Sequence, residues 1–394
     1  MNIRGERRHS MSIFATRRAQ LIKELMQEPI DAVLINNPSN LYYYTGFTGG
    51  EAMFLMPVNG DIMSTYAFEL CGISNDSHAI TNDWPDGYVI TDSRYYEQVE
   101  KECEGLQLVK WESKGMAATI QELLSEDKKI QVILEDDMNL AQYMKLTEVC
   151  KNCAFTLGSK WIQKPRMVKD AEELAKLEQA EHIGDAAFTH ILDIMKPGVS
   201  EREIALELEF FMKKQGATKL SFDTIVASGA NGSMPHAQVT DRLLQNGDFV
   251  TMDFGCVYQG YCSDMTRTVA IGTPTDEMKK VYQIVLDANL RAMEQITAGK
   301  RCNEIDAVAR DYIREQGYGD YFGHGLGHGV GLDIHEEPRF SPKCDVITQE
   351  NMVITDEPGI YLPGQFGVRI EDLVVVKQDG YQKLSQSEKK LIIL

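Results

Sequence analysis

The sequence predicts a mixed α/β (α+β) protein of two domains. Its 394 residues exceed what one hydrophobic core usually contains. Strand-like and helix-like segments alternate in the first part of the chain, which is typical of a small α/β domain. The rest contains two stretches that resemble each other in their helices, glycines and acidic strands. We therefore expect an N-terminal α/β domain at 11–160 and a C-terminal domain of two similar halves at 161–394.

The expected N-terminal domain contains short apolar runs between amphipathic segments. Four runs are typical of strands: DAVLI (31–35), YVIT (88–91), LQLVKW (106–111) and QVILE (131–135). In AMFLMPVNGDIMSTY (52–66), the pair Asn59-Gly60 predicts a tight β-hairpin. The following WIQKPRMVKD (161–170) has mixed charge, a proline and no clear period, so we expect a linker.

The expected C-terminal domain begins with helices. Apolar spacing, capping residues and terminal glycines place them from Asp170 to Met195, from Ser200 to Gly216, from about 275 to 299 and from about 303 to 317. Ser200 and Glu203 form a capping-box pattern at the start of the second helix.

These helices belong to an internal repeat. A shift of 101 residues superimposes Gly198 on Gly299, Glu203 on Glu304, Ile204 on Ile305, Gln215 on Gln316 and Gly216 on Gly317. Each copy is followed by an acidic strand, VTMDFG (250–255) and ITDEPG (354–359), which align at a shift of 104. We infer two halves that face each other about an approximate twofold axis, with a cleft between them as a natural binding site.

The first half contains two aspartates on a predicted hairpin. Asp253 and Asp264 are eleven residues apart, and the sequence between them is turn-like. A turn centred between Tyr258 and Gln259 would place the carboxylates opposite each other, and a turn one residue later would make them diagonal neighbours. In both registers they point to the same face.

The second half repeats the pattern with glutamates. Glu357 and Glu371 flank a turn centred on Gly364, so they also share one face of a hairpin. Arg369 lies on the same face as Glu371, because side chains alternate along a strand.

Four carboxylates in one cleft raise one another's pKa and become protonated unless cations lie among them. Two divalent cations would balance the charge, and His328 of GHGLGHGVGLDIHE (323–336) would add a nitrogen ligand. Such an oxygen-dominated set suits Mn, Fe, Co or Zn. Carboxylates bridge ions about 3.5–4 Å apart, and a water between the ions would become a hydroxide nucleophile near neutral pH. The pattern therefore predicts a hydrolase.

Composition excludes several kinds of partner. The net charge of −19 argues against nucleic acids and membrane surfaces. No apolar run approaches the length of a membrane helix, and MNIRGERRHS (1–10) lacks the apolar stretch of a signal peptide. Eight scattered cysteines, Cys150 and Cys153 among them, are expected to be reduced. These features predict a cytoplasmic protein.

The histidine- and glycine-rich segment occurs together with MDFG (252–255), SDMTRT (263–268), DEPGIY (356–361) and GVRIED (367–372). In this combination the chain resembles the pita-bread metallopeptidases, which include methionine aminopeptidase, aminopeptidase P and prolidase. The resemblance implies a pita-bread fold at 161–394 and metal ligation by Asp253, Asp264, His328, Glu357 and Glu371, with Asp264 and Glu371 bridging. It implies two divalent ions per chain, Mn²⁺ first, with Co²⁺ or Zn²⁺ as alternatives.

The N-terminal segments NLYYYTGF (40–47) and ITDSRYYEQ (90–98) are similar to the creatinase-type domain of aminopeptidase P and prolidase. Methionine aminopeptidases usually lack this domain. The resemblance therefore implies cleavage of a peptide bond before proline, which is a tertiary amide whose nitrogen has no N–H. It also implies a homodimer in which the N-terminal domain lies near the partner's cleft.

The resemblance implies roles for further residues. Glu357 would take a proton from the nucleophilic water and pass it to the leaving nitrogen. His335 would bind the scissile carbonyl or its oxyanion, and His236 would contact the proline side of the substrate. His324 would shape the site or serve the fold alone.

For each of two arginines, two roles are possible. Arg369 would hold a ligand carboxylate or form an ordinary strand ion pair. Arg339, in HEEPRFS (335–341), would bind the free carboxylate of a dipeptide, which favours a dipeptidase, or would be a surface residue.

Two other function classes stay open. The fold could support a metal-free binding or scaffold protein, or a metal-independent amidino hydrolase similar to creatinase. The presence of all five ligand positions argues against both. Between prolidase and aminopeptidase P, the sequence leaves the choice open.

Overall fold

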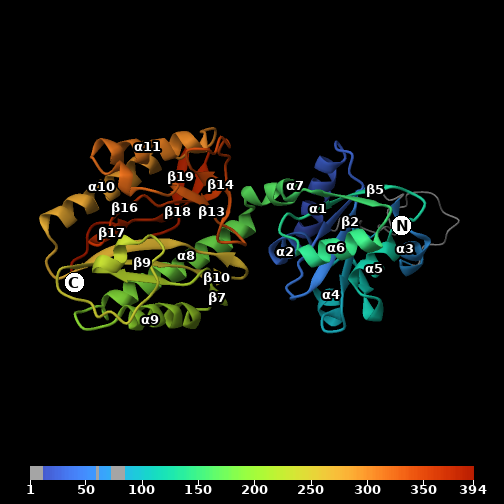
Figure 1. Ribbon diagram of the computed structural model, residues 1–394, viewed down its shortest axis with the longest axis horizontal. Coiled ribbons are helices and arrows are strands. Elements are labelled where there is room, and N and C mark those ends of the chain that lie inside the picture. The colour runs from blue at the N-terminus through green and yellow to red at the C-terminus, as the bar shows by residue number, and fades with distance from the viewer. Residues whose placement is uncertain (1–11, 59–61, 72–84) are drawn as a thin grey trace, which may run out of the picture. The chain divides into compact units, whose positions relative to one another are not determined.

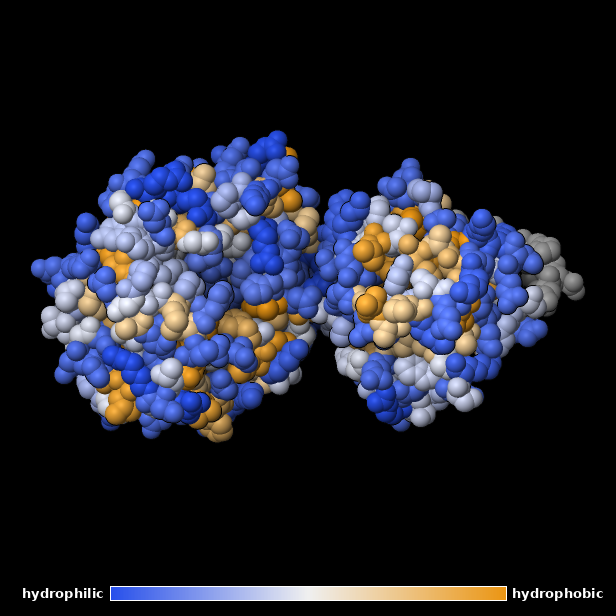
Figure 2. Space-filling view, viewed as in Figure 1, coloured by the Kyte–Doolittle hydropathy of each residue, from blue (hydrophilic) through white to orange (hydrophobic). Residues whose placement is uncertain are grey.

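The computed structural model describes residues 12–58, 62–71 and 85–394. The N-terminal segment MNIRGERRHS and the Asn59-Gly60 turn lie outside the described residues. The chain divides into two compact units, 1–165 and 166–394, and Figure 1 shows the elements of each. The face shown in Figure 2 is mainly hydrophilic, with apolar patches on each unit. No helix in the described part is long and apolar enough to cross a membrane.

The first unit is built on one mixed sheet of six strands. Their order is β4-β3-β2-β1-β5-β6, and the pairs β1–β5, β5–β6 and β3–β4 are parallel. The strands are β1 Ala32–Ile35, β2 Ala52–Pro57, β3 Tyr88–Thr91, β4 Gln107–Lys110, β5 Ile130–Leu134 and β6 Cys153–Leu157. The helices are α1 Ile13–Leu25, α2 Pro38–Thr45, α3 Thr65–Leu70, α4 Tyr96–Glu102, α5 Met116–Leu123, α6 Leu140–Val149 and α7 Ser159–Gln163. Strands β1 and β3 are buried throughout, as expected where elements cover both faces of a sheet.

One local prediction in this region is wrong. Strand β2 pairs with β1 and β3, so it offers no free edge to a hairpin partner, and residues 65–70 form helix α3 instead. The predicted linker 161–170 does contain the boundary between the two units, at 165/166. It is helical rather than irregular, because it includes the end of α7 and a 3-10 helix at Lys164–Met167.

The second unit contains the four predicted helices. They are α8 Ala171–Leu192, α9 Glu201–Lys214, α10 Asp276–Met293 and α11 Cys302–Glu315. The capping box of Ser200 and Glu203 is confirmed, and Asp170 forms a second one with Glu173. Helix α10 ends well before Gly299, whose backbone instead bonds to Thr348.

The strands of this unit confirm the two similar halves. In the first half, β8 Ile225–Ser228, β9 Asp248–Phe254 and β12 Met265–Ile271 form one sheet, and β7 Lys219–Leu220, β10 Cys256–Tyr258 and β11 Tyr261–Cys262 form another. In the second half, one sheet contains β13 Gly327–Gly329, β14 Glu336–Phe340, β15 Val353–Asp356, β18 Asp372–Lys377 and β19 Gly380–Lys383, and β16 Gly359–Leu362 pairs with β17 Phe366–Arg369. Each half packs two helices on its own apolar core, and in Figure 1 helices α10 and α11 lie on the opposite side of the strands from α9.

Candidate active site

The first acidic hairpin adopts the later of the two predicted registers. Its turn is Gln259-Gly260, where both residues have positive φ, 47° and 90°. In the β9–β12 pair Asp253 lies opposite Thr266, so Asp264 is its diagonal neighbour. Both aspartates line one cavity.

The second hairpin turns at Gly364, as predicted. Asp356 of β15 lies opposite Asp372 of β18, and the same register continues in β16 and β17. Glu357 and Glu371 occupy the intervening positions, where the hairpin passes from one sheet to the other. Each acidic hairpin thus places its carboxylates where it leaves a sheet.

The glycine-rich segment brings His328 to these carboxylates. A Cβ on Gly327 would lie 1.9 Å from the carbonyl oxygen of Thr355, so only glycine lets β13 approach β15 this closely. A Cβ on Gly329 would lie 2.5 Å from the carbonyl oxygen of Glu337. The alternating glycines therefore allow the backbone to press against both neighbours while the histidine faces the cavity.

The acidic groups and the imidazole meet in a cavity of about 710 Å³. Ligand atoms of Asp264, His328 and Glu371 all lie within 4.8 Å of one another. The Nε2 of His328 is 3.5 Å from Asp264 Oδ2 and 3.4 Å from Glu357 Oε1. Asp253 lines the same cavity, and its Oδ1 is buried without a hydrogen-bond partner.

Burial makes the ionised form of these carboxyl groups energetically unfavourable. Desolvation, followed by repulsion from neighbouring carboxylates, raises the pKa of Asp264 and Glu371 well above their ordinary values. Burial raises the pKa of Glu357 to about 8, although Arg369 opposes the shift. Divalent cations among these oxygens would remove the penalty, so the residues fit a metal centre.

His328 has the tautomer that a metal ligand needs. Its Nδ1 lies 3.1 Å from the carbonyl oxygen of Gly329. Because a carbonyl oxygen only accepts, Nδ1 carries the proton and the lone pair of Nε2 faces the carboxylates. Burial lowers the pKa of His328 to about 3, which keeps the ring neutral.

Arg369 connects the two halves. Its Nη2 donates to Asp253 Oδ2 at 2.6 Å, and its Nε donates to Thr266 Oγ1 at 3.0 Å. The hydroxyl of Thr266 in turn donates to Glu371 Oε2 at 2.6 Å. One guanidinium therefore orients carboxylates from both hairpins.

The sequence reasoning missed Tyr361, a buried residue of the same network. Its hydroxyl accepts from Arg369 Nη1 at 2.8 Å and lies 3.0 Å from His324 Nε2. Burial lowers the pKa of His324 to about 4, and its Nδ1 lies 2.8 Å from the carbonyl oxygen of Gly325. Strand alternation from Glu357 would have placed Tyr361 on the cavity side, since the two residues differ by an even number.

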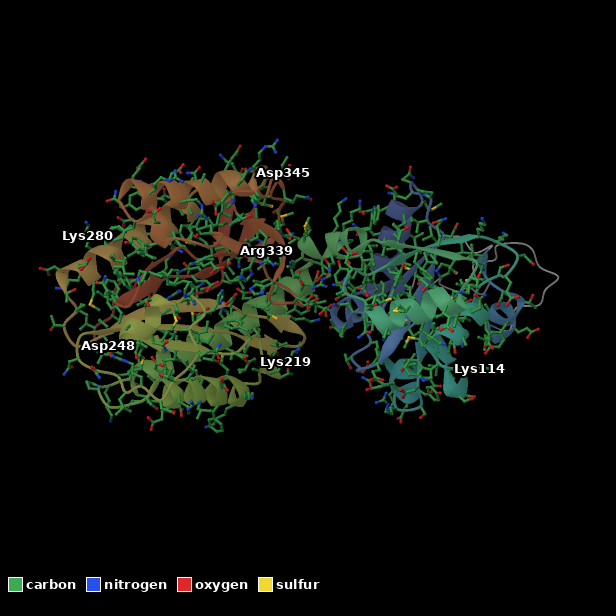
Figure 3. The ribbon with its side chains drawn as sticks, viewed as in Figure 1. Lys114, Lys219, Asp248, Lys280, Arg339 and Asp345 are labelled. Carbon is green, nitrogen blue, oxygen red and sulfur yellow. The ribbon has the colours of Figure 1, made fainter. Side chains whose placement is uncertain are left out.

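The remaining predicted residues line the open part of the cavity. The ring of His335 lies 4.5 Å from the ring of His328, and partial burial, with the charge of Arg339, lowers the pKa of His335. His236 is exposed and lines the cavity from the segment between β8 and β9. Arg339, which is 41 % exposed, belongs to β14 of the second half and is labelled in Figure 3. The cavity thus brings together all the residues predicted for the site: His236, Asp253, Asp264, His324, His328, His335, Arg339, Glu357, Arg369 and Glu371.

Comparison with known proteins finds a family match in each part of the chain. Residues 175–378 match the family Metallopeptidase family M24, and residues 17–168 match the Creatinase/Prolidase N-terminal domain. An Xaa-Pro dipeptidase of Pyrococcus furiosus is 35 % identical over 373 residues, which cover 95 % of this chain and 98 % of that protein.

Solved structures also match nearly the whole chain. An Xaa-Pro dipeptidase from Bacillus anthracis has a TM-score of 0.85 and 39 % identity, and the match covers 97 % of this chain and 100 % of that chain. An X-Pro aminopeptidase from Thermotoga maritima has a TM-score of 0.80 and 36 % identity, covering 96 % and 100 %.

Removal of divalent ions should make the folded protein less stable as the pH rises. The raised pKa values of Asp264, Glu357 and Glu371 mean that the folded metal-free protein binds protons that the unfolded chain releases near pH 3.8 for the aspartate and pH 4.5 for the glutamates. Its free energy of unfolding should therefore fall as the pH rises from about 5 to 8. Urea unfolding across this range checks the slope, and Mn²⁺ at about 100 times Kd should restore about 2.7 kcal/mol.

Glu371→Gln is the control for this experiment, because it removes one buried charge and should flatten the slope. A metal-free protein whose stability is constant or rises between these pH values would contradict the assignment.

Proposed function

This chain belongs to metallopeptidase family M24, and we propose that it hydrolyses the peptide bond before proline, as an Xaa-Pro dipeptidase or aminopeptidase. The observation that carries the proposal is the meeting of four carboxyl groups and His328 in one cavity, beside the exposed His335. The names of similar full-length proteins, Xaa-Pro dipeptidase and X-Pro aminopeptidase, support the choice of substrate.

The metal centre of the proposal contains two divalent ions, Mn²⁺ first and Co²⁺ or Zn²⁺ as alternatives. Asp253, Asp264, His328, Glu357 and Glu371 would hold them, with Asp264 and Glu371 shared. When bound, the ions supply Lewis acidity that activates water and polarises the scissile carbonyl. The burial and mutual repulsion of the four carboxyl groups support two divalent ions, whose charge of +4 would balance four carboxylates.

Glu357 is the proposed proton carrier. It is largely buried at the cavity wall, and one of its oxygens accepts from Thr355 Oγ1 at 3.3 Å. In the proposed reaction it takes a proton from the attacking water and delivers it to the proline nitrogen, which cannot leave as an anion.

His335, His236 and Arg339 are the proposed substrate ligands. The lowered pKa of His335 leaves a neutral imidazole that donates to the carbonyl oxygen. His236 would contact the substrate on its proline side. Arg339 lines the cavity, and in the proposal its guanidinium binds a free carboxylate directly after proline. This favours a dipeptidase over an aminopeptidase.

We also propose a cytoplasmic homodimer. The resemblance to prolidases supports the dimer, and the eight unpaired cysteines support a reducing compartment. Sedimentation velocity at micromolar concentration tests the dimer.

Glu357→Gln should reduce kcat on an Xaa-Pro substrate about 10²–10⁴-fold, because the leaving nitrogen loses its proton donor. Glu350→Gln, at an exposed glutamate, is the matched control and should keep normal activity. Metal content is measured beside the rates. A Glu357→Gln protein that retains most of its kcat would refute the proton-carrier role.

Arg339→Met should separate dipeptides from longer substrates. Loss of a charged hydrogen bond costs about 1.5–3 kcal/mol, so kcat/KM for Ala-Pro should fall about 10–100-fold. Ala-Pro-Ala, whose carboxylate is one residue further away, should change less than about threefold on the same argument.

Lys343→Met, at an exposed lysine on the following loop, is the control. Equal losses on both substrates after Arg339→Met would mean that Arg339 does not read the dipeptide carboxylate.

A further inference from the structure

The last eleven residues of the chain form a segment that contacts residues next to both acidic hairpins. We call Leu384–Leu394 the C-terminal strap. Its end pairs with the edge of β12: Ala270 N donates to Ile392 O, and Leu394 N donates to Ala270 O, both at 2.9 Å. The strap is therefore attached to a strand of the first half, although it follows the second half in the chain.

Near its start the strap contacts Glu181, which accepts a hydrogen bond from the backbone of Asp264. Ser385 is fully buried, and its hydroxyl donates to Glu181 Oε1 at 2.6 Å. The other oxygen of Glu181 accepts from the backbone N–H of Asp264 at 3.2 Å. Ser385 Oγ also accepts from Leu373 N at 2.8 Å. One hydroxyl therefore contacts Glu181, which bonds to Asp264 of the first hairpin, and Leu373, which follows the second hairpin.

Further along, the strap contacts the residue next to Glu371. Lys389 Nζ lies 2.6 Å from Asp372 Oδ2 and donates to Asn289 Oδ1 at 2.6 Å. Asp372 is fully buried and points away from the cavity, because Glu371 beside it points in. Fixing the Asp372 carboxylate thus fixes the direction of Glu371.

Arg267 completes the connection between the strap and Glu371. Its Nη2 donates to Asp372 Oδ1 at 2.8 Å, and its Nη1 donates to the backbone oxygen of Glu371. The same guanidinium donates to the carbonyl oxygens of Ser387 and Glu388 in the strap, at 2.9 and 3.2 Å. The strap therefore orients Arg267, and Arg267 in turn orients Glu371 and Asp372.

We propose that the C-terminal strap positions the metal ligands: Ser385 positions Asp264 through Glu181, and Lys389 positions Glu371 through Asp372. This rests on the proposed metal centre. The ligand carboxylates repel one another, so their positions before an ion binds depend on what holds them from behind. Partners that orient metal ligands typically account for 10–100-fold in affinity.

The test is Mn²⁺ binding to the metal-free full-length protein, measured by calorimetry. Ser385→Ala and Lys389→Met should each weaken binding about tenfold. Ser385→Thr keeps the hydroxyl and should restore most of the affinity. Lys390→Met removes an exposed charge from the same strap and is the matched control, which should bind like the unmodified protein.

Melting temperatures of the metal-free variants separate positioning from stability alone. Melting temperatures that fall while the Kd of both variants stays within twofold of the unmodified chain would overturn the proposal. If Lys389→Met fails to fold, the Kd of Ser385→Ala decides. An unmodified chain that binds no Mn²⁺ would contradict the metal centre itself, which is a different outcome from unchanged variants.

A second measurement uses the unmodified chain. Coupling is reciprocal, so bound Mn²⁺ should slow hydrogen exchange in strap peptides. Strand β1 of the first unit is the internal reference, and its exchange should change little. Strap exchange that is the same with and without Mn²⁺ would also overturn the proposal.

Discussion

The structure of the second unit depends on one electrostatic constraint: four acidic side chains lie in one largely buried cavity. Like charges at this depth cannot all stay ionised, and burial with mutual repulsion raises the pKa of Asp264 and Glu371 well above their ordinary values. The surrounding residues reduce this cost. Arg369 donates to Asp253, and the hydroxyl of Thr266 donates to Glu371. The neutral ring of His328 adds a lone pair without adding charge.

The internal repeat explains how one chain assembles such a cluster. Each half supplies a hairpin that leaves its sheet at the carboxylates, and each hairpin has its own helices and core behind it. The acidic side chains therefore lie in or directly beside paired strands, each backed by the core of its own half. A cavity between two such halves has defined ligand positions, which metal-assisted hydrolysis requires.

The sequence predicted that these residues would share one cavity, because the proposed ligands follow strand alternation around two recognisable turns. The sequence left two registers possible for the first hairpin, one residue apart. The turn at Gln259 and Gly260, where both residues have positive φ, selects the later register. The sequence analysis missed Tyr361, and it predicted a hairpin at 52–66 where β2 already has two neighbours. Ser385 could not be predicted at all, because its bond to Glu181 spans 204 residues and no local pattern marks it.

The most direct test of the metal centre is an anomalous-difference map from crystals of the full-length chain grown with Mn²⁺. Our account predicts two strong peaks among Asp253, Asp264, His328, Glu357 and Glu371, with Asp264 and Glu371 touching both. A map without peaks in this cavity, or with Mn²⁺ only at surface carboxylates, would contradict it.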